Sequence, residues 1–268
     1  MTAPAAPFSA ERTAPLSVRA VLRLGGLAAW TAFAALVWGI GSMLGGRWRW
    51  TVRCRGLWAR ASLRILGVRS RVLGTCPAGG FLLAANHLSY LDVLLLSANV
   101  PVRFVAKREV RGWPVWGPLA AWTGTLFIDR DRPRDARRVA DELSASLAKG
   151  EAAVIFAEGT SSPGEDVLPY RPALFAAAIE SRCSVVPARV QYLVPDRPGA
   201  ERAEVCWWGD MDFGPHLLGL VALQRIDARL TIGAPLPPGN DRRELALRAH
   251  RATTDLLQSP FSEDGPTC

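Results

Sequence analysis

The stretch PAGGFLLAANHLSYLDVLLLSANV, residues 77–100, is one of the most apolar parts of the chain. FLLAANH (81–87) predicts a buried strand that ends in a loop, and YLDVLLLSA (90–98) predicts the helix that follows it. A strand that leads directly into a helix is the repeating unit of α/β proteins. The histidine and the aspartate inside this apolar stretch therefore need an explanation.

Strand and helix patterns alternate along most of the chain after residue 70. Further strands are predicted at 102–107, 124–129, 152–160, 184–193, 203–208 and 227–233. Further helices are predicted at 135–150, 172–181 and 241–258. We therefore expect an α/β fold with a mainly parallel sheet flanked by helices, and functional loops at the carboxyl ends of the strands.

The run LGGLAAWTAFAALVWGIGSMLGG (24–46) carries no charge and is long enough to cross a hydrocarbon core of ~30 Å. A cleaved signal peptide fits less well because RWRW follows, whereas the glycines leave a hairpin dipping into one leaflet open. The arginines that follow the run place the rest of the chain on the cytoplasmic face of the cell membrane. The expected parts are a disordered leader (1–18), a membrane anchor with a juxtamembrane segment (19–70), an α/β domain (71–258) and a tail (259–268).

The chain is basic, with a net charge of +8 carried almost wholly by arginine. Such a charge favours phosphate on nucleic acid, on anionic lipid or on a small acidic substrate. No nucleic-acid recognition motif accompanies the arginines, so we expect membrane lipids and no nucleic acid as partners. The five cysteines include no CxxC pair, which indicates neither a disulfide framework nor a zinc site, and we expect no metal. The sequence makes no prediction of the oligomeric state.

His87 and Asp92 are five positions apart, about 140° around a regular helix, so they would not face each other on one helix. They can meet if His87 lies in the loop after the strand and Asp92 in the first turn of the next helix. A carboxylate then fixes the tautomer of the imidazole and allows it to take a proton from a hydroxyl. The alternative is a structural core histidine beside a helix cap, and the pair alone does not decide between them.

Two other predicted strands also end in polar residues. FAEGTSS (156–162) ends its strand in a glutamate, a glycine and three hydroxyls, and backbone N–H groups here could bind a phosphate or a developing oxyanion. GTLFIDR (124–130) ends in Asp129 and Arg130, and an arginine suits bidentate contact with phosphate. Three such strand ends in order make a chance arrangement less plausible than an active site.

These segments resemble the four sequence motifs of the glycerolipid acyltransferases, the family of 1-acyl-glycerol-3-phosphate acyltransferase. NHLSYLD is similar to the NHxxxxD motif, GTLFIDR to the second motif, FAEGTSS to the third and VVPARV (185–190) to the fourth. The resemblance covers about residues 80–195, with a plausible continuation to 235. It implies that 71–258 is an acyltransferase domain of phospholipid synthesis, with no cofactor besides acyl-CoA or acyl carrier protein as co-substrate.

The resemblance implies a role for each matching residue. His87 would be the general base on the free hydroxyl of the acceptor lipid, and Asp92 would orient it while the hydroxyl attacks the acyl thioester. No acyl-enzyme is required. The acceptor-binding residues implied by the second and third motifs are Arg130, Glu158, Gly159 and Thr160. Pro187 matches the fourth motif, which is linked to acyl-donor binding or to the shape of the pocket.

Ser161, also a candidate for acceptor binding, departs from the family pattern, which usually has an arginine at this position. The downstream segments VLPYRPALF and WWGDMDFGPHLL resemble a branch that includes lyso-ornithine-lipid acyltransferases, whose acceptor has no phosphate. Arg171 could replace the missing charge. Lysophosphatidic acid, giving phosphatidic acid, is therefore the first expectation for the acceptor, and lyso-ornithine lipid is the alternative.

Two other classes of function are compatible with parts of the sequence. A serine hydrolase is disfavoured because the chain has no GxSxG motif. A non-catalytic membrane-tethered lipid-binding module remains the alternative of another class. Trp113, Trp116 and Trp122 lie among basic residues, and we expect them either to rest on the bilayer or to pack into the core. His216 and His250 have no visible partners and are expected to be structural or surface residues.

Overall fold

A single mixed sheet lies at the centre of the computed structural model, which describes residues 17–43 and 47–256. Its strands are β1 (Val68–Leu73), β2 (Leu82–Ala85), β3 (Val102–Lys107), β4 (Leu126–Ile128), β5 (Ala152–Phe156), β6 (Val185–Leu193) and β7 (Ile226–Ile232). They are arranged in the order β1-β7-β6-β2-β5-β3-β4, and every neighbouring pair is parallel except β6 and β7. The predicted α/β fold with a mainly parallel sheet is confirmed.

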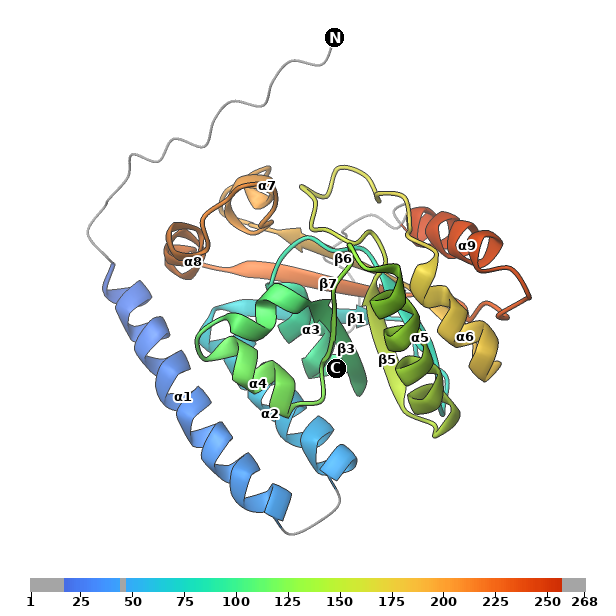
Figure 1. The fold of residues 1–268 in the computed structure, drawn as a ribbon. Coiled ribbons are helices and arrows are strands. Elements are labelled where there is room, and N and C mark those ends of the chain that lie inside the picture. The colour runs from blue at the N-terminus through green and yellow to red at the C-terminus, as the bar shows by residue number, and fades with distance from the viewer. Residues whose placement is uncertain (1–16, 44–46, 257–268) are drawn as a thin grey trace.

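Helices cover both faces of this sheet (Figure 1). The α-helices are α1 (Val18–Met43), α2 (Arg47–Ile65), α3 (Leu91–Asn99), α4 (Trp116–Trp122), α5 (Pro133–Ala148), α6 (Ala176–Ser181), α7 (Glu201–Glu204), α8 (Phe213–Ala222) and α9 (Arg242–Asp255). Two short 3₁₀ helices are η1 (Arg108–Gly112) and η2 (Ala173–Phe175). Helices α5, α6 and α9 lie on one side of the sheet, and α2 and α3 lie on the other.

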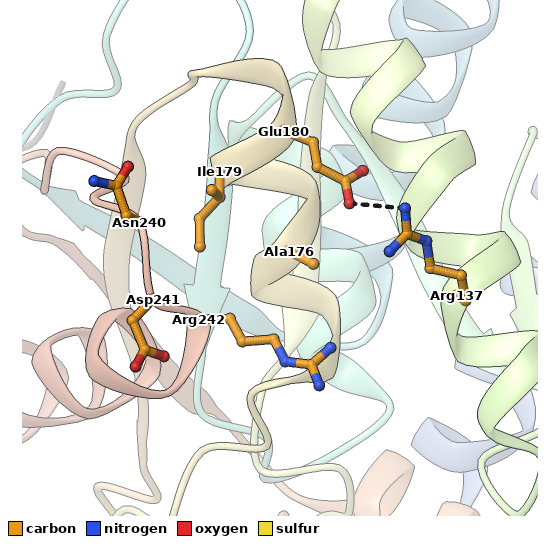
Figure 2. Close-up of a pocket in the computed structure, with 7 residues that line it drawn as sticks. All are labelled: Arg137, Ala176, Ile179, Glu180, Asn240, Asp241 and Arg242. Atoms are coloured by element: carbon orange, nitrogen blue, oxygen red, sulfur yellow. Dashed lines mark ion pairs between the residues drawn. The ribbon is translucent and has the colours of Figure 1, made fainter.

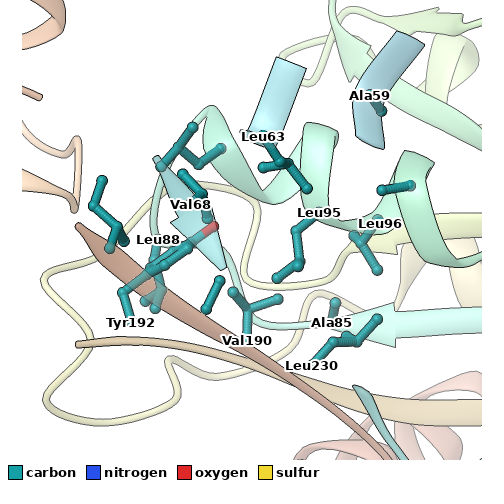
Figure 3. Close-up of a cluster of buried hydrophobic side chains, with 14 of the residues drawn as sticks. Ala59, Leu63, Val68, Ala85, Leu88, Leu95, Leu96, Val190, Tyr192 and Leu230 are labelled. Carbon is teal, nitrogen blue, oxygen red and sulfur yellow. The ribbon is translucent and has the colours of Figure 1, made fainter. Parts of the chain in front are cut away.

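Strand β2 is buried on both faces, which explains why its sequence is continuously apolar rather than alternating. Leu83 and Ala85 belong to the hydrophobic core that also contains α2, α3 and α8. Leu82 and Ala84 belong to the second core, beneath α5, α6 and α9. Figure 3 shows the first of these cores, where side chains of α3 pack against β2 and β6.

The predicted elements correspond to observed ones with one exception. The strand predicted at 203–208 is wrong, because Glu201–Glu204 forms helix α7 and the residues after it form a loop. The side chain of Glu201 accepts a hydrogen bond from the Val194 N–H at 2.8 Å, and its carbonyl accepts the Cys206 N–H. These local bonds replace the strand pairing that the apolar pattern indicated. Helices α2, α4 and α8 and strand β1 were not predicted.

Helix α1 has the length and composition of a membrane span from Val18 to Gly41. Both of its ends contact the rest of the protein. Near the first end, Arg23 donates hydrogen bonds to the carbonyls of Val221 and Gln224 at the end of helix α8, each at 3.0 Å. Near the other end, Trp38 stacks on Trp122 of α4, with ring centroids 4.9 Å apart. Helix α1 therefore lies alongside the domain rather than apart from it.

Most of the predicted leader and the whole predicted tail lie outside the described residues, as do Leu44, Gly45 and Gly46 at the end of the apolar run. The predicted juxtamembrane segment is largely helix α2. Two of its arginines bind the protein itself, since Arg55 is buried and donates to the Val102 carbonyl, and Arg60 donates to the Ala98 carbonyl at 2.7 Å. These two side chains attach α2 to α3 and β3, so they are not available to lipid headgroups.

The three tryptophans between the first two motifs all pack against aromatic side chains. Trp122 contacts Trp38, Trp116 contacts Trp58 with centroids 6.4 Å apart, and Trp113 lies 6.1 Å from Trp207. Trp122 still keeps 41% of its surface exposed. All three tryptophans therefore pack against other parts of the protein, and membrane contact by the exposed part of Trp122 stays a prediction.

Candidate active site

His87 and Asp92 meet at the carboxyl end of β2. His87 lies in the loop after the strand, Asp92 lies in the first turn of α3, and His87 Nδ1 is 2.7 Å from Asp92 Oδ2. The chain can bring them together because the loop turns between them, as the sequence spacing predicts. Their geometry fits a histidine whose orientation is set by a carboxylate.

Asp92 is completely buried, yet its carboxylate is well supplied with hydrogen-bond donors. The backbone N–H groups of Leu88 and Ser89 donate to Oδ2 at 2.7 and 3.1 Å. The hydroxyl of Tyr192, in strand β6, donates to Oδ1 at 2.7 Å. Several donors offset the cost of burying a carboxylate at this position.

The free nitrogen of His87 is Nε2. Because Nδ1 donates its proton to Asp92, Nε2 carries the lone pair that can accept a proton. The imidazole stacks on the ring of Phe156, the last residue of β5, with centroids 3.9 Å apart. Its side chain is 23% exposed, in contrast to the buried Asp92. The pair therefore has a buried acidic end and an accessible basic end, which is the arrangement needed by a general base.

The loop after β5, which contains the third motif, lies directly against the histidine. The Ser162 N–H donates to the His87 carbonyl at 2.9 Å, and the Ala157 N–H donates to the Ala85 carbonyl at 3.1 Å. Gly159 adopts φ +75°, a conformation that favours glycine. In the described part of the chain, the N–H groups of Thr160 and Ser161 make no hydrogen bond within the protein. These two amides can therefore face a ligand.

Glu158 points into the protein rather than toward the exposed side of this loop. Its side chain is buried, and Oε1 accepts a hydrogen bond from the Leu168 N–H at 3.2 Å. Burial raises the pKa of Glu158 to about 8, and the negative charge of Asp92 also raises it. Nearby N–H groups and the Ser162 hydroxyl act in the opposite direction. The carboxyl is thus predominantly protonated at neutral pH.

Arg130 and Arg171 form a pair of positive charges beside Gly159. Arg130 Nη1 donates to the Gly159 carbonyl, and a Cβ atom at position 159 would lie 2.5 Å from Arg171 Nε. Burial lowers the pKa of Arg130, and the positive charge of Arg171 lowers it further. Neither guanidinium forms an ion pair with a described residue. Two neighbouring guanidinium groups without a carboxylate partner can bind an anion.

A small cavity of about 150 Å³ lies beside these arginines, and neither His87 nor Asp92 is among the residues that line it. Its walls are mainly apolar, and they include Ile128, Ile155 and Leu174. Phe156, which stacks on His87, also lines it together with Arg130 and Arg171. The cavity therefore combines an anion-binding rim with apolar walls, a combination that suits an amphipathic ligand.

Comparison with known proteins identifies the family. The Acyltransferase family model matches residues 68–191. Lyso-ornithine lipid O-acyltransferase of Brucella abortus is 35% identical over 223 residues, which cover 78% of this chain and 84% of that protein. The chain belongs to the acyltransferase family. It is an enzyme, and the non-catalytic lipid-binding module is not supported.

One further relative and one solved structure are informative. 1-acyl-sn-glycerol-3-phosphate acyltransferase of Neisseria meningitidis is 32% identical over 151 residues, which cover 56% of this chain and 58% of that protein. The crystal structure of the 1-acyl-sn-glycerophosphate acyltransferase PlsC from Thermotoga maritima has a TM-score of 0.66, with 18% identity, over 92% of this chain and all of that one. The structural likeness shows that the two proteins share the fold.

The acyltransferase has a larger hollow elsewhere, between α5, α6 and the start of α9 (Figure 2). It has a volume of about 400 Å³ and contains none of the predicted site residues. Arg137, at its edge, is paired with Glu180 at 3.3 Å. Among the described residues, no group of three or more histidine, cysteine or acidic side chains could hold a metal ion. The smaller cavity remains the better candidate because Arg130, Gly159 and Arg171 line it, together with Phe156, which stacks on His87.

Pro187, from the fourth motif, is an interior residue of the sheet. It is buried in β6, opposite Ala84 of β2, and its carbonyl accepts the Gly233 N–H at 2.8 Å. Pro187 does not line the cavity beside Arg130 and Arg171.

Sequence reasoning missed three residues around this loop: Phe156, Tyr90 and Tyr192. Phe156 stacks on His87, and Tyr192 holds Asp92. Tyr90 donates to Nδ1 of the buried His216 at 3.0 Å, while His216 Nε2 donates to the Cys206 carbonyl at 3.1 Å. His216 therefore has a structural place beside the first motif. The only available signal was the presence of aromatic side chains within otherwise apolar runs.

Proposed function

We propose that this acyltransferase transfers a fatty acyl group from acyl-CoA or acyl carrier protein to the free hydroxyl of a lysolipid. The observation that carries the proposal is the 2.7 Å contact between His87 Nδ1 and Asp92 Oδ2, because it leaves Nε2 as an oriented base on a partly exposed side chain. The named relatives act on lysolipids, which supports the same class of acceptor here.

The reaction needs one base and no covalent enzyme intermediate. His87 Nε2 takes the proton from the acceptor hydroxyl as its oxygen attacks the thioester carbonyl. The carbon–sulfur bond then breaks, and the thiol leaves with the proton that the imidazolium returns. Asp92 stabilises the imidazolium in between, and we assign the N–H groups of Thr160 and Ser161 to the developing oxyanion because they make no hydrogen bond within the described part of the chain. The products are an ester and a free thiol.

We propose lyso-ornithine lipid as the first candidate acceptor. Relatives with that name match 78% of this chain, including the region after the fourth motif, whereas the Neisseria relative matches 56%. Ser161 supplies no positive charge for a phosphate, and the pair Arg130 and Arg171 suits the single carboxylate of an ornithine headgroup. Lysophosphatidic acid is the second candidate, because the same two arginines also suit a phosphate.

A transfer assay distinguishes the two acceptors. Labelled acyl-CoA and acyl carrier protein are offered separately with each lysolipid in vesicles, using wild type, His87→Ala and a double Arg130→Gln, Arg171→Gln variant. We expect faster transfer to lyso-ornithine lipid, loss of transfer in His87→Ala and a higher KM in the double variant. Faster transfer to lysophosphatidic acid would reverse the order of acceptors, and full activity of His87→Ala would overturn the general-base mechanism.

We also propose that α1 attaches the enzyme to one leaflet of the membrane, with the catalytic domain on the cytoplasmic face. Its exposed side chains include Leu22, Phe33, Leu36 and Ile40, and each is more than half exposed. Because both ends of α1 contact the domain, the helix fits a shallow insertion along the bilayer better than an isolated span. The arginines that follow α1 support the cytoplasmic face, because the cytoplasmic leaflet carries the anionic lipids that attract basic segments.

Vesicle flotation tests this attachment. Leu36→Glu and Ile40→Glu should each weaken binding to vesicles, since they place a charge on the proposed lipid-facing side. Leu247→Glu is the matched control, because Leu247 is 49% exposed on α9, on another part of the surface. Equal flotation of all three variants would contradict a membrane role for α1.

A further inference from the structure

The most completely bonded polar group near the candidate catalytic centre is the carboxylate of Asp92. Its Oδ2 atom contacts His87 Nδ1 and two backbone N–H groups, whereas its Oδ1 atom accepts from the hydroxyl of Tyr192 at 2.7 Å. Tyr192 is 100 positions away in the sequence, in strand β6. Oδ1 is therefore held by a side chain outside the loop of His87.

Strand β6 is fixed against this loop by a second side chain. Asn86 Nδ2 donates to the Val190 carbonyl at 3.1 Å, and Asn86 Oδ1 accepts from the Val190 N–H at 2.7 Å. These bonds hold the end of β2 to β6 just before Tyr192. Figure 3 shows Tyr192 between Leu88 and Val190 in the buried core. The bonds of Asn86 to Val190 thus fix the part of β6 that carries the Tyr192 side chain.

Tyr192 remains a hydrogen-bond donor throughout the neutral range. Burial raises the pKa of its hydroxyl well above the ordinary value, and the adjacent charge of Asp92 raises it further. An ionised carboxylate only accepts hydrogen bonds, so a phenol hydroxyl that keeps its proton is the donor in this contact. The positive end of its O–H dipole therefore always faces Asp92 Oδ1.

We propose that Tyr192 is a positioning residue of the acyl-transfer reaction, whose hydroxyl orients Asp92 and tunes the proton affinity of His87. This inference rests on the proposed role of His87 as the base. The hydroxyl prevents rotation of the carboxylate, so that Oδ2 stays directed at His87 Nδ1. It also offsets part of the negative charge of Asp92. Without it, the imidazolium would be favoured and His87 would hold its proton to higher pH.

The test is Tyr192→Phe, compared with Tyr90→Phe. Both variants lose one tyrosine hydroxyl with a side-chain partner, but the hydroxyl of Tyr90 contacts His216 rather than Asp92. We expect Tyr192→Phe to lower kcat about 10- to 100-fold, the range for losing a hydrogen bond to a charged group. The acidic limb of its kcat/KM profile should move to higher pH, whereas the limb of Tyr90→Phe should not move.

A second measurement reads His87 without acyl transfer. The rate at which diethylpyrocarbonate modifies His87, obtained by subtracting the His87→Ala rate, reports the fraction of neutral imidazole at each pH. Its pH profile should move upward in Tyr192→Phe. A fall in kcat with both profiles unmoved would overturn the role of Tyr192. Activity retained by His87→Ala would instead refute the proposed base, while the modification profile would still test the effect of Tyr192 on His87.

A second variant covers the case in which Tyr192→Phe does not fold. Incorporation of 3-fluorotyrosine at position 192 keeps the hydroxyl and nearly the same shape, and makes the hydroxyl a stronger donor. Both pH profiles should then move in the opposite direction, to lower pH. Movement to higher pH, or none, would contradict the proposed polarity of the contact.

Discussion

Asp92 and Glu158 are both buried carboxyl groups at the carboxyl ends of neighbouring strands, but the protein holds them differently. Asp92 accepts hydrogen bonds from His87, two backbone amides and Tyr192. Glu158 accepts one from the Leu168 N–H, and its Oε2 atom has no hydrogen-bond partner among the described residues. Burial is similar at the two sites, so the supply of donors makes the difference.

The difference separates two functions within one site. A carboxylate with several donors can stay charged and stabilise an imidazolium, which is what the base requires. A carboxyl with few donors keeps its proton, and the pKa of Glu158 is accordingly raised to about 8 by burial. Glu158 is therefore suited to supporting the loop of Gly159 rather than to contacting a positively charged group.

The largest expected effect comes from replacing the carboxyl of Asp92 with an amide. The same change at Glu158 provides the comparison. Asp92→Asn removes the charge that His87 needs, and we expect kcat/KM to fall about 10²- to 10⁴-fold, the usual contribution of a general base. Glu158→Gln resembles the protonated form that already predominates at neutral pH. Its kcat/KM should fall less than about tenfold, a smaller loss than general-base removal causes. Initial rates with a labelled acyl donor at neutral pH measure both.

The unfolding temperatures of the two variants provide the control, because a shared loss of folding would hide the difference. Similar losses of kcat/KM in two folded variants would show that Glu158 also acts as an ion. Glu158 would then be ionised in the active enzyme, and the distinction between Glu158 and Asp92 that is drawn from its single hydrogen bond would be wrong.

Much of the fold, and the contact between His87 and Asp92, could be predicted from the sequence. The contact of His87 with Asp92 follows from a loop and a first helical turn, both local features. The contact of Asp92 with Tyr192 could not be predicted, because it depends on β6 lying next to β2 in the sheet. Strand order is set by the whole chain rather than by local pattern.

The remaining failures have related causes. Arg55 is one of the arginines that follow the apolar run and, by composition, would face the membrane surface, but it is buried and donates to the Val102 carbonyl. The local sequence of 203–208 has an apolar pattern, but the hydrogen bond from the Trp207 N–H to the Leu88 carbonyl belongs to a loop beside the first motif. In both cases a tertiary hydrogen bond overrides what composition indicates.

A smaller effect is expected from Gly159→Ala, which tests the loop that Glu158 supports. Gly159 and Gly150 both have positive φ, 75° and 81°, so alanine should cost stability at either position, by about 1 kcal/mol. Only at 159 would the new Cβ meet Arg171, at 2.5 Å from Nε, because nothing lies within 4 Å at 150. We expect the acceptor KM to rise in Gly159→Ala alone, by about tenfold, as for one weakened charged contact.

Acceptor titrations and unfolding curves for Gly159→Ala and Gly150→Ala separate these two costs. An equal rise in KM in both variants would mean that backbone strain, rather than displacement of Arg171, controls acceptor binding. An unchanged KM in both would remove Arg171 from the proposed anion site.

The last effect concerns stability and pH, and it isolates Glu158 from catalysis. Its pKa is about 8 in the folded protein and near the ordinary value of 4.5 after unfolding. Between these values the folded state keeps a proton that the unfolded state releases. The stability contributed by the protonated carboxyl is therefore full below about pH 4.5 and declines as pH rises toward 8. Glu158→Gln should lack this decline, because an amide does not titrate.

Unfolding free energies at about pH 5, 7 and 9 measure this decline, and they should shift in favour of Glu158→Gln as pH rises. Glu244→Gln, at an exposed position of α9, is the control and should follow wild type. The charge of Asp92 helps to raise the pKa of Glu158, so Asp92→Asn should move the decline to lower pH. Parallel curves for wild type and Glu158→Gln would show that the pKa of Glu158 is not raised in the folded protein, whereas parallel curves for wild type and Asp92→Asn alone would show that the two carboxyls are not coupled.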